Sequence, residues 1–293
     1  MLPKRICRDN TGAVVVTYNP DDGLPSRLRV IGDQVAAVLV VDNASSEGCA
    51  LLRECASLQG VEFAWNETNR GVAAALNQGL GWARGKGFDW LVTLDQDTVV
   101  ADSFVSSIDA VFAAYPNPDR IGLLGSNYIE SYRGEPLLPP EGSTWVEVVF
   151  VITSGMLVPV AVADKIGPLR EDFFVDLVDH EYCLRARSRG YSVILARAPL
   201  MQHRVGEPKW VRLLGKRLTT PNHSPERHYY MSRNLLIVAR DYLVKEPGPV
   251  LGAMATRIKE MILVVCCEQN KWAKLGAAAR GAFDALRGRM GPR

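Results

Sequence analysis

The chain has 293 residues, 47% of them hydrophobic and 23% charged, with a formal net charge of +2. This composition is typical of a globular protein with a sizeable core and excludes a disordered chain. The charge is distributed unevenly, because the residues from Glu207 onward include 16 Lys and Arg against 7 Asp and Glu, a net +9, whereas the preceding residues carry a net −7. Since the positive charge is confined to the tail, the composition argues against a nucleic-acid-binding protein.

The cysteines and the apolar runs indicate a cytoplasmic location. The six cysteines include no C-x-x-C pair, and a chain of this length does not need disulfides to supplement its core. Residues 1–10 lack the apolar stretch of a signal peptide, and the most apolar run, residues 148–163, is shorter than the roughly 20 residues that cross a bilayer. We therefore expect a protein that is soluble or bound to a membrane surface.

Short apolar runs rich in β-branched residues alternate with helix-like stretches in the first half of the chain. Strands separated by helices form parallel β-α-β units, whose ligands bind beyond the carboxyl ends of the strands. The sequence therefore predicts an α/β fold with a mostly parallel sheet. No G-x-G-x-x-G follows the first strand, which argues against a nicotinamide-dependent oxidoreductase. The five strands are expected at residues 13–17, 35–41, 61–64, 90–94 and 121–124.

Acid and amide side chains follow four of these strands. Asn and Asp occur in turns and helix caps whatever the function, so each group alone has a structural explanation. Four strand ends of this kind on one edge of a sheet favour a nucleotide site. The groups are Thr17 to Asn19, Asp42 with Asn43, Asn66 to Asn69, and Asp95 to Asp97.

The second half is expected to contain three more strands and a helical tail. A helix is predicted at residues 179–189, with acids in its first turn and arginines in its last, the order that suits the helix dipole. The pattern is helical from residue 224 to residue 287, with a break at the Pro-Gly-Pro sequence 247–249. The chain thus divides into a nucleotide-binding domain, residues 1–215, and a helical region, residues 216–293. The three strands are expected at residues 144–150, 152–158 and 192–196.

Asp95 and Asp97 are candidates for a metal site. Residues two apart on a strand share a face, so both carboxylates can approach one hard divalent cation, which prefers oxygen ligands and substrate phosphates. His203, just past a later strand, could add a ring nitrogen, which would favour Mn²⁺ over Mg²⁺. Such a metal acts as a Lewis acid on a departing diphosphate. The alternative is an acidic loop with no ligand.

Asp179 is the candidate general base. It lies at the start of the helix predicted at 179–189, just after a segment that also contains Asp172 and Asp176. A positioned carboxylate that accepts a hydroxyl proton contributes about 10²- to 10⁴-fold to a reaction rate. The structural alternative is that Asp179 only caps the helix, which is worth about 1 kcal/mol.

Five motifs occur in order along the chain: Val41 to Ser45, Asn69 to Asn77, Leu94 to Thr98, Ser154 with Gly155, and Val175 to Arg185. Together they resemble those of family 2 glycosyltransferases, and within that family those of bacterial rhamnosyltransferases. The resemblance covers about residues 13–205, and two tail segments, 227–234 and 284–289, also look like that subgroup.

The resemblance implies a GT-A domain, a Mg²⁺ or Mn²⁺ cofactor, and inversion at the anomeric carbon, so that dTDP-β-L-rhamnose would give an α-L-rhamnoside. It implies that Asp97 and His203 bind the metal and that Asp179 is the base. The acceptor would be a cell-surface or lipid-linked glycan at the cytoplasmic face of the inner membrane. UDP-linked donors and other sugars, such as galactofuranose, glucose and N-acetylhexosamine, remain alternatives. The residues expected around the nucleotide sugar are Thr17, Asn19, Asp42, Asn69, Arg70, Asp95, Ser154, Gly155 and Arg233.

The tail offers two further candidates. Arg233 suits phosphate because its planar fork donates two hydrogen bonds, and the alternative is an arginine on a solvated helix face. The last helix carries an apolar stripe flanked by basic residues, which suits an anionic membrane surface. Packing of this helix on its own domain or on a homodimer partner is the alternative. The stripe consists of Trp272, Leu275, Ala279, Phe283, Leu286 and Met290.

Two other functions use the same residues. The sequence Asp95 to Val99 also fits the signature of haloacid-dehalogenase-type phosphatases, with Asp95 as nucleophile and Lys165 among the later motifs. That signature normally follows the first strand of its domain, whereas three strand-helix units precede it here. A non-catalytic sugar-nucleotide-binding protein is the second alternative, and the intact carboxylates at Asp95, Asp97 and Asp179 argue against it.

Overall fold

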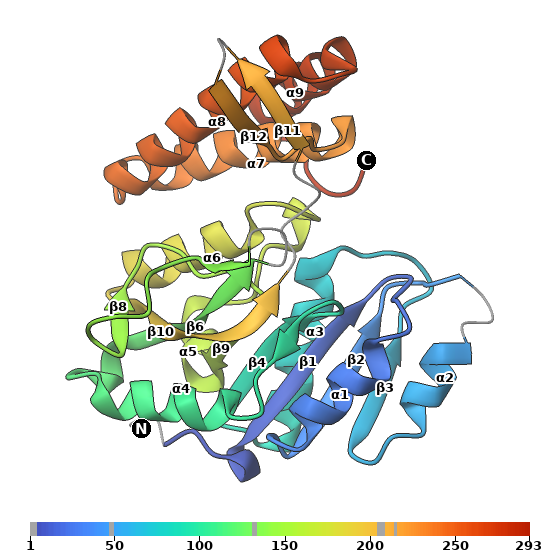
Figure 1. Ribbon diagram of the computed structural model, residues 1–293, viewed down its shortest axis with the longest axis vertical. Helices are drawn as coiled ribbons and strands as arrows, with labels where there is room; N and C mark the ends of the chain where they lie inside the picture. The colour runs from blue at the N-terminus through green and yellow to red at the C-terminus, as the bar shows by residue number, and fades with distance from the viewer. Residues whose placement is uncertain (1–4, 47–49, 131–133, 204–208, 214–215) are drawn as a thin grey trace.

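The computed structural model describes residues 5–46, 50–130, 134–203, 209–213 and 216–293. Figure 1 shows a sheet flanked by helices in the lower part of the molecule and a group of helices stacked above it. The expected α/β fold is confirmed.

The first four major strands form the parallel half of the sheet, in the order β3-β2-β1-β4. The register places Thr17 beside Asp42 and Val16 beside Asp95, so the polar residues that end these strands lie along one edge. The predicted positions of these strands are confirmed to within a few residues. They are β1 (Thr11–Thr17), β2 (Ala37–Asp42), β3 (Val61–Trp65) and β4 (Trp90–Asp95).

The second half of the sheet is mixed. β9 (Met156–Pro159) runs antiparallel to both β4 and β6 (Ile121–Glu130), and β10 (Ser192–His203) runs parallel to β6. Three short strands, β5 (Val99–Val100), β7 (Glu135–Pro136) and β8 (Trp145–Glu147), pair with β10 or β6.

Two strands expected in this half were placed wrongly. The run 144–150 forms only the three residues of β8, and the run 152–158 enters the sheet only at Met156. The reason is a turn at Gly155, whose φ is +73°, and where a β-carbon would lie 2.5 Å from the Met201 sulfur. The strand expected at 192–196 instead continues to His203, which carries that imidazole to the edge where β4 ends.

Helices cover both faces of the sheet. Successive side chains of β1 point to opposite faces, and each face packs against a different group of helices. Val14 joins one apolar core, with α3, α5 and α6, whereas Ala13 and Val15 join the other, with α1, α2 and α4. Short 3₁₀ helices lie at Arg8–Asn10, Pro118–Arg120 and Glu171–Phe173. The α-helices are α1 (Leu24–Gly32), α2 (Ala50–Ala56), α3 (Val72–Lys86), α4 (Phe104–Ala114), α5 (Val160–Ile166) and α6 (Val178–Ser188).

The C-terminal region contains the antiparallel pair β11 (Lys209–Leu213) and β12 (Lys216–Thr220), followed by three helices. The boundary expected between residues 215 and 216 therefore falls between two paired strands, and residue 215 itself lies outside the described residues. The helices are α7 (Pro225–Tyr242), α8 (Pro247–Cys267) and α9 (Lys271–Leu286).

The helix boundaries differ from expectation at two points. The break expected at residues 247–249 is found just before them, at residues 243–246, and Pro247 and Pro249 lie in the first turn of α8, where the missing N–H of proline has no intrahelical partner. A second break separates α8 from α9, where Asn270 has a φ of +53°. α9 then packs against α7 at Gly281, where any β-carbon would collide with the carbonyl oxygen of Tyr229.

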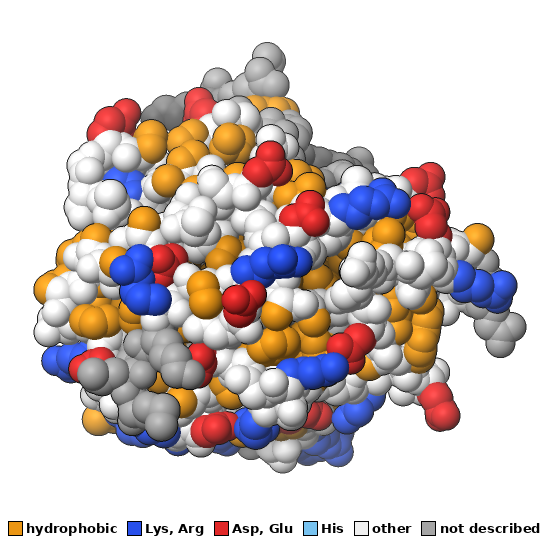
Figure 2. Space-filling view, turned by 90° about the horizontal axis from the view of Figure 1, so that it is seen from below, with side chains coloured by type: hydrophobic (Ala, Val, Ile, Leu, Met, Phe, Trp, Pro, Cys, Tyr) orange, Lys and Arg blue, Asp and Glu red, His pale blue; other side chains and the backbone are white. Residues whose placement is uncertain are grey.

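No helix in the described part of the chain is long and apolar enough to span a bilayer. On the lower face of the molecule, opposite the C-terminal helices, Figure 2 shows acidic and basic side chains interspersed. The charge of that face is therefore mixed.

Candidate functional site

Two adjoining cavities lie at the carboxyl edge of the parallel strands. The strand-end cavity, about 550 Å³, is bounded by the ends of β1 and β4 and by the loop before α3. The helix cavity, about 840 Å³, lies between the start of α6 and the helices α7 and α8. Five residues line both cavities, so the two meet there: Val72, Asp95, Val175, His203 and Arg227.

Asp95, Asp97 and His203 come together at this junction. The His203 ring nitrogens lie 4.0 Å from Asp95 Oδ2 and 4.0 Å from Asp97 Oδ1, and one ligand atom from each residue lies within 4.8 Å of the others. Burial raises the pKa of Asp95 to about 6, and the neighbouring Asp97 and Asp179 carboxylates add to the rise. Two carboxylates and an imidazole are a donor set that fits Mn²⁺ or Mg²⁺.

Buried hydroxyl groups hold this cluster in place. The Asp95 amide donates to Ser154 Oγ (3.2 Å), and the Ser154 hydroxyl is hydrogen-bonded to that of Thr98. Thr98 Oγ1 in turn lies 3.2 Å from His203 Nδ1. Ser154 is buried and lines neither cavity, so its position supports the cluster and does not contact a ligand.

Asp179 lies in the first turn of α6 and lines the helix cavity. Its Oδ1 accepts hydrogen bonds from the backbone N–H of His180 (2.8 Å) and from the imidazole Nδ1 (2.9 Å). Burial works to raise the pKa of Asp179, but the charge and the hydrogen bonds of His180 outweigh it, and the pKa lies below its ordinary value. Asp179 is therefore ionised at neutral pH. The helix cap position belongs to Leu177, so Asp179 is not the capping residue.

The loops after β1 and β2 are organised mainly by their own polar groups. Thr17 Oγ1 donates to the buried Asp42 (2.9 Å), whose other oxygen accepts from the Ser45 amide (2.9 Å). The Asn19 amide donates to Ser45 Oγ (2.8 Å). Thr17 lines the strand-end cavity, whereas Asp42 and Asn19 line neither cavity.

The loop before α3 contributes Asn69 but not Arg70. Asn69 lines the strand-end cavity, and its Oδ1 accepts from the Gly71 amide (2.9 Å). Arg70 points outward, half-exposed, toward Glu171 (3.6 Å). Gly71 has a φ of +82°, and a β-carbon there would meet the Phe174 carbonyl, so the loop fits closely against the segment before α6.

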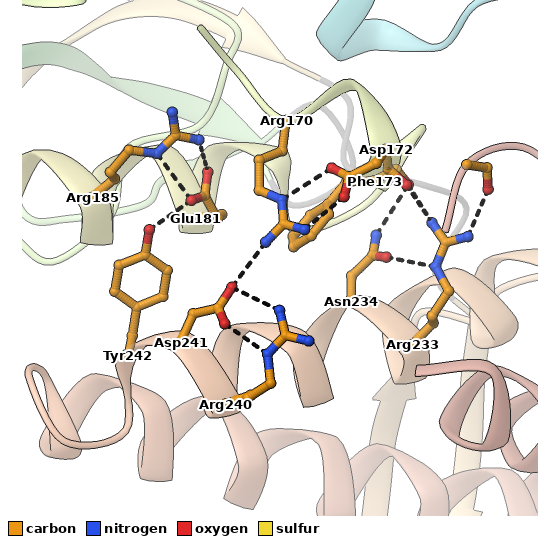
Figure 3. Close-up of polar contacts among 11 residues, drawn as sticks. Arg170, Asp172, Phe173, Glu181, Arg185, Arg233, Asn234, Arg240, Asp241 and Tyr242 are labelled. Atoms are coloured by element: carbon orange, nitrogen blue, oxygen red, sulfur yellow. Dashed lines mark hydrogen bonds and ion pairs between the residues drawn. The ribbon is translucent and has the colours of Figure 1, made fainter. Parts of the chain in front are cut away.

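The structure places Arg233 away from both cavities. It is 1% exposed, and its guanidinium donates to the carbonyls of Gly291 (2.6 Å), Asp172 (2.9 Å) and Phe173 (3.0 Å). Figure 3 shows Arg233 and its neighbour Asn234 reaching from α7 to this segment. With its donors committed to carbonyls, Arg233 is not available to the nucleotide, contrary to expectation.

Asn234 extends the same contact toward the start of α6. Its Nδ2 donates to the carbonyls of Phe173 (3.2 Å), Val175 (2.9 Å) and Asp176 (2.9 Å). Three non-glycine residues of this segment have positive φ: Phe174 (64°), Asp176 (61°) and Leu177 (61°). Such backbone is costly and persists when its surroundings hold it. α7 therefore fixes the segment that leads into Asp179.

Further polar contacts dock the C-terminal helices on the first domain (Figure 3). The Tyr242 hydroxyl donates to Glu181 Oε1 (2.6 Å), and Glu181 also pairs with Arg185. Arg170 bridges Asp172 (2.6 Å) and Asp241 (2.9 Å). The two regions thus share a buried interface, and the helix cavity is part of it.

Of the residues expected in the site, six line the cavities: Thr17, Asn69, Asp95, Asp97, Asp179 and His203. Asn19, Asp42, Arg70, Ser154, Gly155 and Arg233 do not. Asn43 and Gln96 also line the strand-end cavity, and although both lie within the sequence motifs, neither was assigned to the site. The α8 residues Gly252, Ala253 and Thr256 are small or neutral, and nothing in the sequence indicated that they line a cavity.

The phosphatase alternative is not favoured. Asp95 ends β4, after three earlier strand-helix units, and Lys165 is exposed on α5 and lines neither cavity. Lys165, the lysine that such a phosphatase site would need, is therefore not beside Asp95.

Comparisons with known proteins agree with this geometry. Residues 13–127 match the family described as Glycosyl transferase family 2. A dTDP-rhamnosyl transferase of Shigella flexneri, RfbF, is 27% identical over 300 residues, which cover 96% of this chain and 97% of the relative. Among solved structures, residues 1–349 of TarS from S. aureus superpose with a TM-score of 0.62 and 13% identity, covering 94% of this chain and 81% of that one. GalNAc-T7, solved with UDP, GalNAc and Mn²⁺, gives a TM-score of 0.58 and 14% identity, covering 97% and 58%. Residues 13–127 thus match glycosyl transferase family 2, and the fold of the chain is that of GT-A glycosyltransferases.

Proposed function

We propose that the protein transfers L-rhamnose from dTDP-β-L-rhamnose to a hydroxyl group of a cell-surface or lipid-linked glycan, with inversion at the anomeric carbon. The observation that supports it most is that the candidate metal ligands and the candidate base lie around adjoining cavities. Asp95 lines both cavities, and Asp179 lines the helix cavity beside it. The likeness to the Shigella flexneri dTDP-rhamnosyl transferase, along nearly the whole chain, supports the donor.

Asp95, Asp97 and His203 would hold a Mg²⁺ or Mn²⁺ ion at this junction. When bound, such an ion supplies Lewis-acid stabilisation of the negative charge on the departing diphosphate. GalNAc-T7, which has the same fold, was solved with Mn²⁺ and UDP, and this supports the assignment.

Asp179 would act on the acceptor. As the acceptor oxygen forms its bond to the anomeric carbon, the bond from that carbon to the diphosphate oxygen breaks, and its electron pair leaves with dTDP. The acceptor proton passes to the Asp179 carboxylate, which is ionised at neutral pH because His180 lowers its pKa. Attack from the helix cavity on a donor in the strand-end cavity gives inversion, so the β-linked donor yields an α-linked product.

A donor panel tests the proposal. Purified protein is incubated with Mn²⁺ and a set of dTDP- and UDP-linked sugars, and release of the nucleoside diphosphate is measured together with thermal stabilisation. We expect dTDP-rhamnose to be hydrolysed fastest and to raise the melting temperature most. A clear preference for a UDP-linked sugar would reject the donor assignment, and no response to any sugar nucleotide would reject the function.

The helix cavity is proposed to bind the acceptor. The Phe150 and His180 rings pack there with centroids 4.2 Å apart, beside Asp179, and small residues of α8 form the opposite wall. Aromatic surfaces and a few polar groups in a concave site are typical of small-molecule and sugar sites.

Filling this cavity should block the acceptor but not the donor. Ala253 lines the cavity, whereas Ala255, two residues later on α8, is exposed and does not. Ala253→Trp is expected to lower transfer by roughly 10²-fold, because a displacement of even 1 Å at the reacting groups has an effect of that order. Donor affinity and slow donor hydrolysis should stay near the wild-type values. Ala255→Trp makes the same change outside the cavity, and an equal loss of transfer in this control would refute the acceptor assignment.

α9 is proposed to bind an anionic membrane surface at the cytoplasmic face of the inner membrane. Most of its apolar stripe faces solvent, with Trp272 78%, Phe283 49% and Leu286 82% exposed, while Ala277, Gly281 and Ala285 form the buried side. This exposure is inconsistent with the stripe packing on its own domain. The membrane is preferred to a second copy of the chain because basic residues adjoin the stripe, each worth about 1 kcal/mol near an anionic surface. They are Lys271, Arg280, Arg287 and Arg289, whereas Lys274, also expected among them, is buried and paired with Glu268.

Vesicle sedimentation tests this surface. The protein should sediment with vesicles that contain phosphatidylglycerol and should dissociate from them at high salt. It should not bind vesicles of phosphatidylcholine alone. Replacing both Phe283 and Leu286 with Ser should abolish binding, whereas Leu137→Ser, at an exposed leucine elsewhere on the molecule, should not. Concentration-dependent dimers that the Ser replacements disrupt, without vesicle binding, would instead identify a second copy as the occupant.

A further inference from the structure

Arg227 lies where the two cavities meet, and the structure gives it no role in the function proposed so far. It is the third residue of α7, with its backbone N–H bonded to the helix-capping Ser224 (3.2 Å). Among the described residues that line the strand-end cavity, Arg227 is the only lysine or arginine. It shares the junction with Asp95 and His203, where a donor's diphosphate would lie if the proposed function holds.

We propose that Arg227 binds the diphosphate of the nucleotide sugar and remains bound to the nucleoside diphosphate as the sugar departs. This rests on the proposed function and adds a second positive group to the metal site. Three carboxylates would repel a diphosphate here: Asp95 at the junction, Asp97 in the strand-end cavity and Asp176 in the helix cavity. An arginine offers a planar fork of donors that matches phosphate oxygens.

The Arg227 side chain is held by Asp176 through Nε and Nη2 and by His223 through Nη1, and each of its two terminal nitrogens still has an N–H group for a ligand. Its Nε lies 3.2 and 3.3 Å from the two Asp176 carboxylate oxygens, and its Nη2 also pairs with Asp176. The Asp176 side chain is only 8% exposed, whereas that of Arg227 is 42% exposed. A guanidinium has five N–H groups, so the contact with Asp176 leaves donors for a ligand. The buried carboxylate thus orients the arginine without using all of its hydrogen-bonding capacity.

The segment that carries Asp176 is itself fixed. Asn234 holds the Asp176 carbonyl (2.9 Å), and Asp176 has a φ of +61°. Asn234 therefore fixes the backbone at Asp176, and Asp176 in turn orients Arg227. Figure 3 shows Asn234 and Arg233 on α7, where they contact this segment.

The nearby histidine does not offer a competing positive charge. His223 Nδ1 lies 3.3 Å from Arg227 Nη1. Burial, together with the charge of Arg227, lowers the pKa of His223 to about 4, so its imidazole is neutral at physiological pH.

The test compares two nucleotides that differ only in one phosphate. Calorimetric affinities for dTDP and dTMP are measured with EDTA, which removes any metal contribution, and again with Mn²⁺. Arg227→Gln should weaken dTDP binding about tenfold, since a charge-assisted bond to the terminal phosphate is lost, and should change dTMP binding less than about twofold. Equal losses for both nucleotides, or no loss for dTDP, would overturn the proposal.

Two controls separate ligand binding from the ion pair. Asp176→Asn removes the partner of Arg227 but keeps the arginine, so the preference for dTDP over dTMP should persist. If Asp176→Asn loses the preference as fully as Arg227→Gln, the effect belongs to the ion pair and the proposal fails. Arg240→Gln, on an exposed arginine of the same helix that also pairs with an aspartate, should leave both affinities unchanged.

A third variant covers misfolding. If circular dichroism shows that Arg227→Gln does not fold, Arg227→Lys replaces it in the test. Lysine keeps the positive charge but lacks the planar fork of donors, so dTDP affinity should fall in part. A preference for dTDP over dTMP equal to that of the wild type would count against a bidentate contact. Wild-type protein that binds neither dTDP nor UDP would mean that the proposed function is at fault, and Arg227 with it.

Discussion

Replacing Asp179 with Asn should lower turnover by about 10²- to 10⁴-fold while leaving donor affinity nearly unchanged. The two side chains have the same shape, so the cavity keeps its form, but the amide cannot take the acceptor proton. Asp179 lines the helix cavity and not the strand-end cavity, which is why the donor should still bind. The measurement is kcat for rhamnosyl transfer beside the dissociation constant of dTDP-rhamnose.

Asp164→Asn is the matched control for this change. Asp164 is an exposed carboxylate on α5, paired with Arg84, and lines neither cavity, so transfer should be unaffected. Full activity in Asp179→Asn would show that another group accepts the proton. A drop in donor affinity of tenfold or more, which corresponds to a loss of at least about 1.4 kcal/mol in binding free energy, would show that Asp179 contacts the donor instead.

The parallel half of the fold follows from the sequence for a simple physical reason. The strands β1, β2 and β4 are buried on both faces and so appear in the sequence as apolar runs bounded by turn residues, a pattern readable without knowledge of the tertiary structure. The same reasoning places Asp95 and Asp97 at the carboxyl edge of the parallel strands, where such sheets bind their ligands. It failed between residues 144 and 158, where Gly155 turns the chain and an apolar sequence packs as a loop.

The error at Arg233 has a geometric cause. Arg227 and Arg233 are both arginines of α7, but six residues place them about 120° apart around a helix, so they face different surroundings. Which side faces the cavity depends on how α7 docks on the segment from Asp172 to Asp176, and that contact is made by residues distant in sequence. Charge type alone could not distinguish the two.

The helix cavity was not predictable for a related reason. Its wall on α8 is formed by small residues, including Gly252 and Ala253, whose short side chains leave the cavity open. A sequence identifies chemical groups but not empty volume, so a cavity of this kind becomes visible only when the two regions are packed together.

Asp97→Ala should weaken the Mn²⁺-dependent part of donor binding by at least about tenfold, because even a change around a metal ligand commonly reduces metal affinity by that factor. Asp97 lines the strand-end cavity, and its Oδ1 lies 4.0 Å from His203 Nδ1, so its loss leaves a site of two ligands. In the wild type, EDTA should weaken dTDP-rhamnose binding and abolish transfer. In Asp97→Ala, EDTA should make little further difference.

The comparison with and without metal decides between two roles for the acidic pair. A carboxylate that only shapes the loop after β4 would affect donor binding equally in Mn²⁺ and in EDTA, whereas a metal ligand affects it only in Mn²⁺. Asp102→Ala, on the same stretch of chain but outside both cavities, should behave as wild type in both conditions. Donor affinity in Mn²⁺ that is identical for Asp97→Ala and the wild type would remove Asp97 from the metal site and leave Arg227 as the main positive group facing the diphosphate.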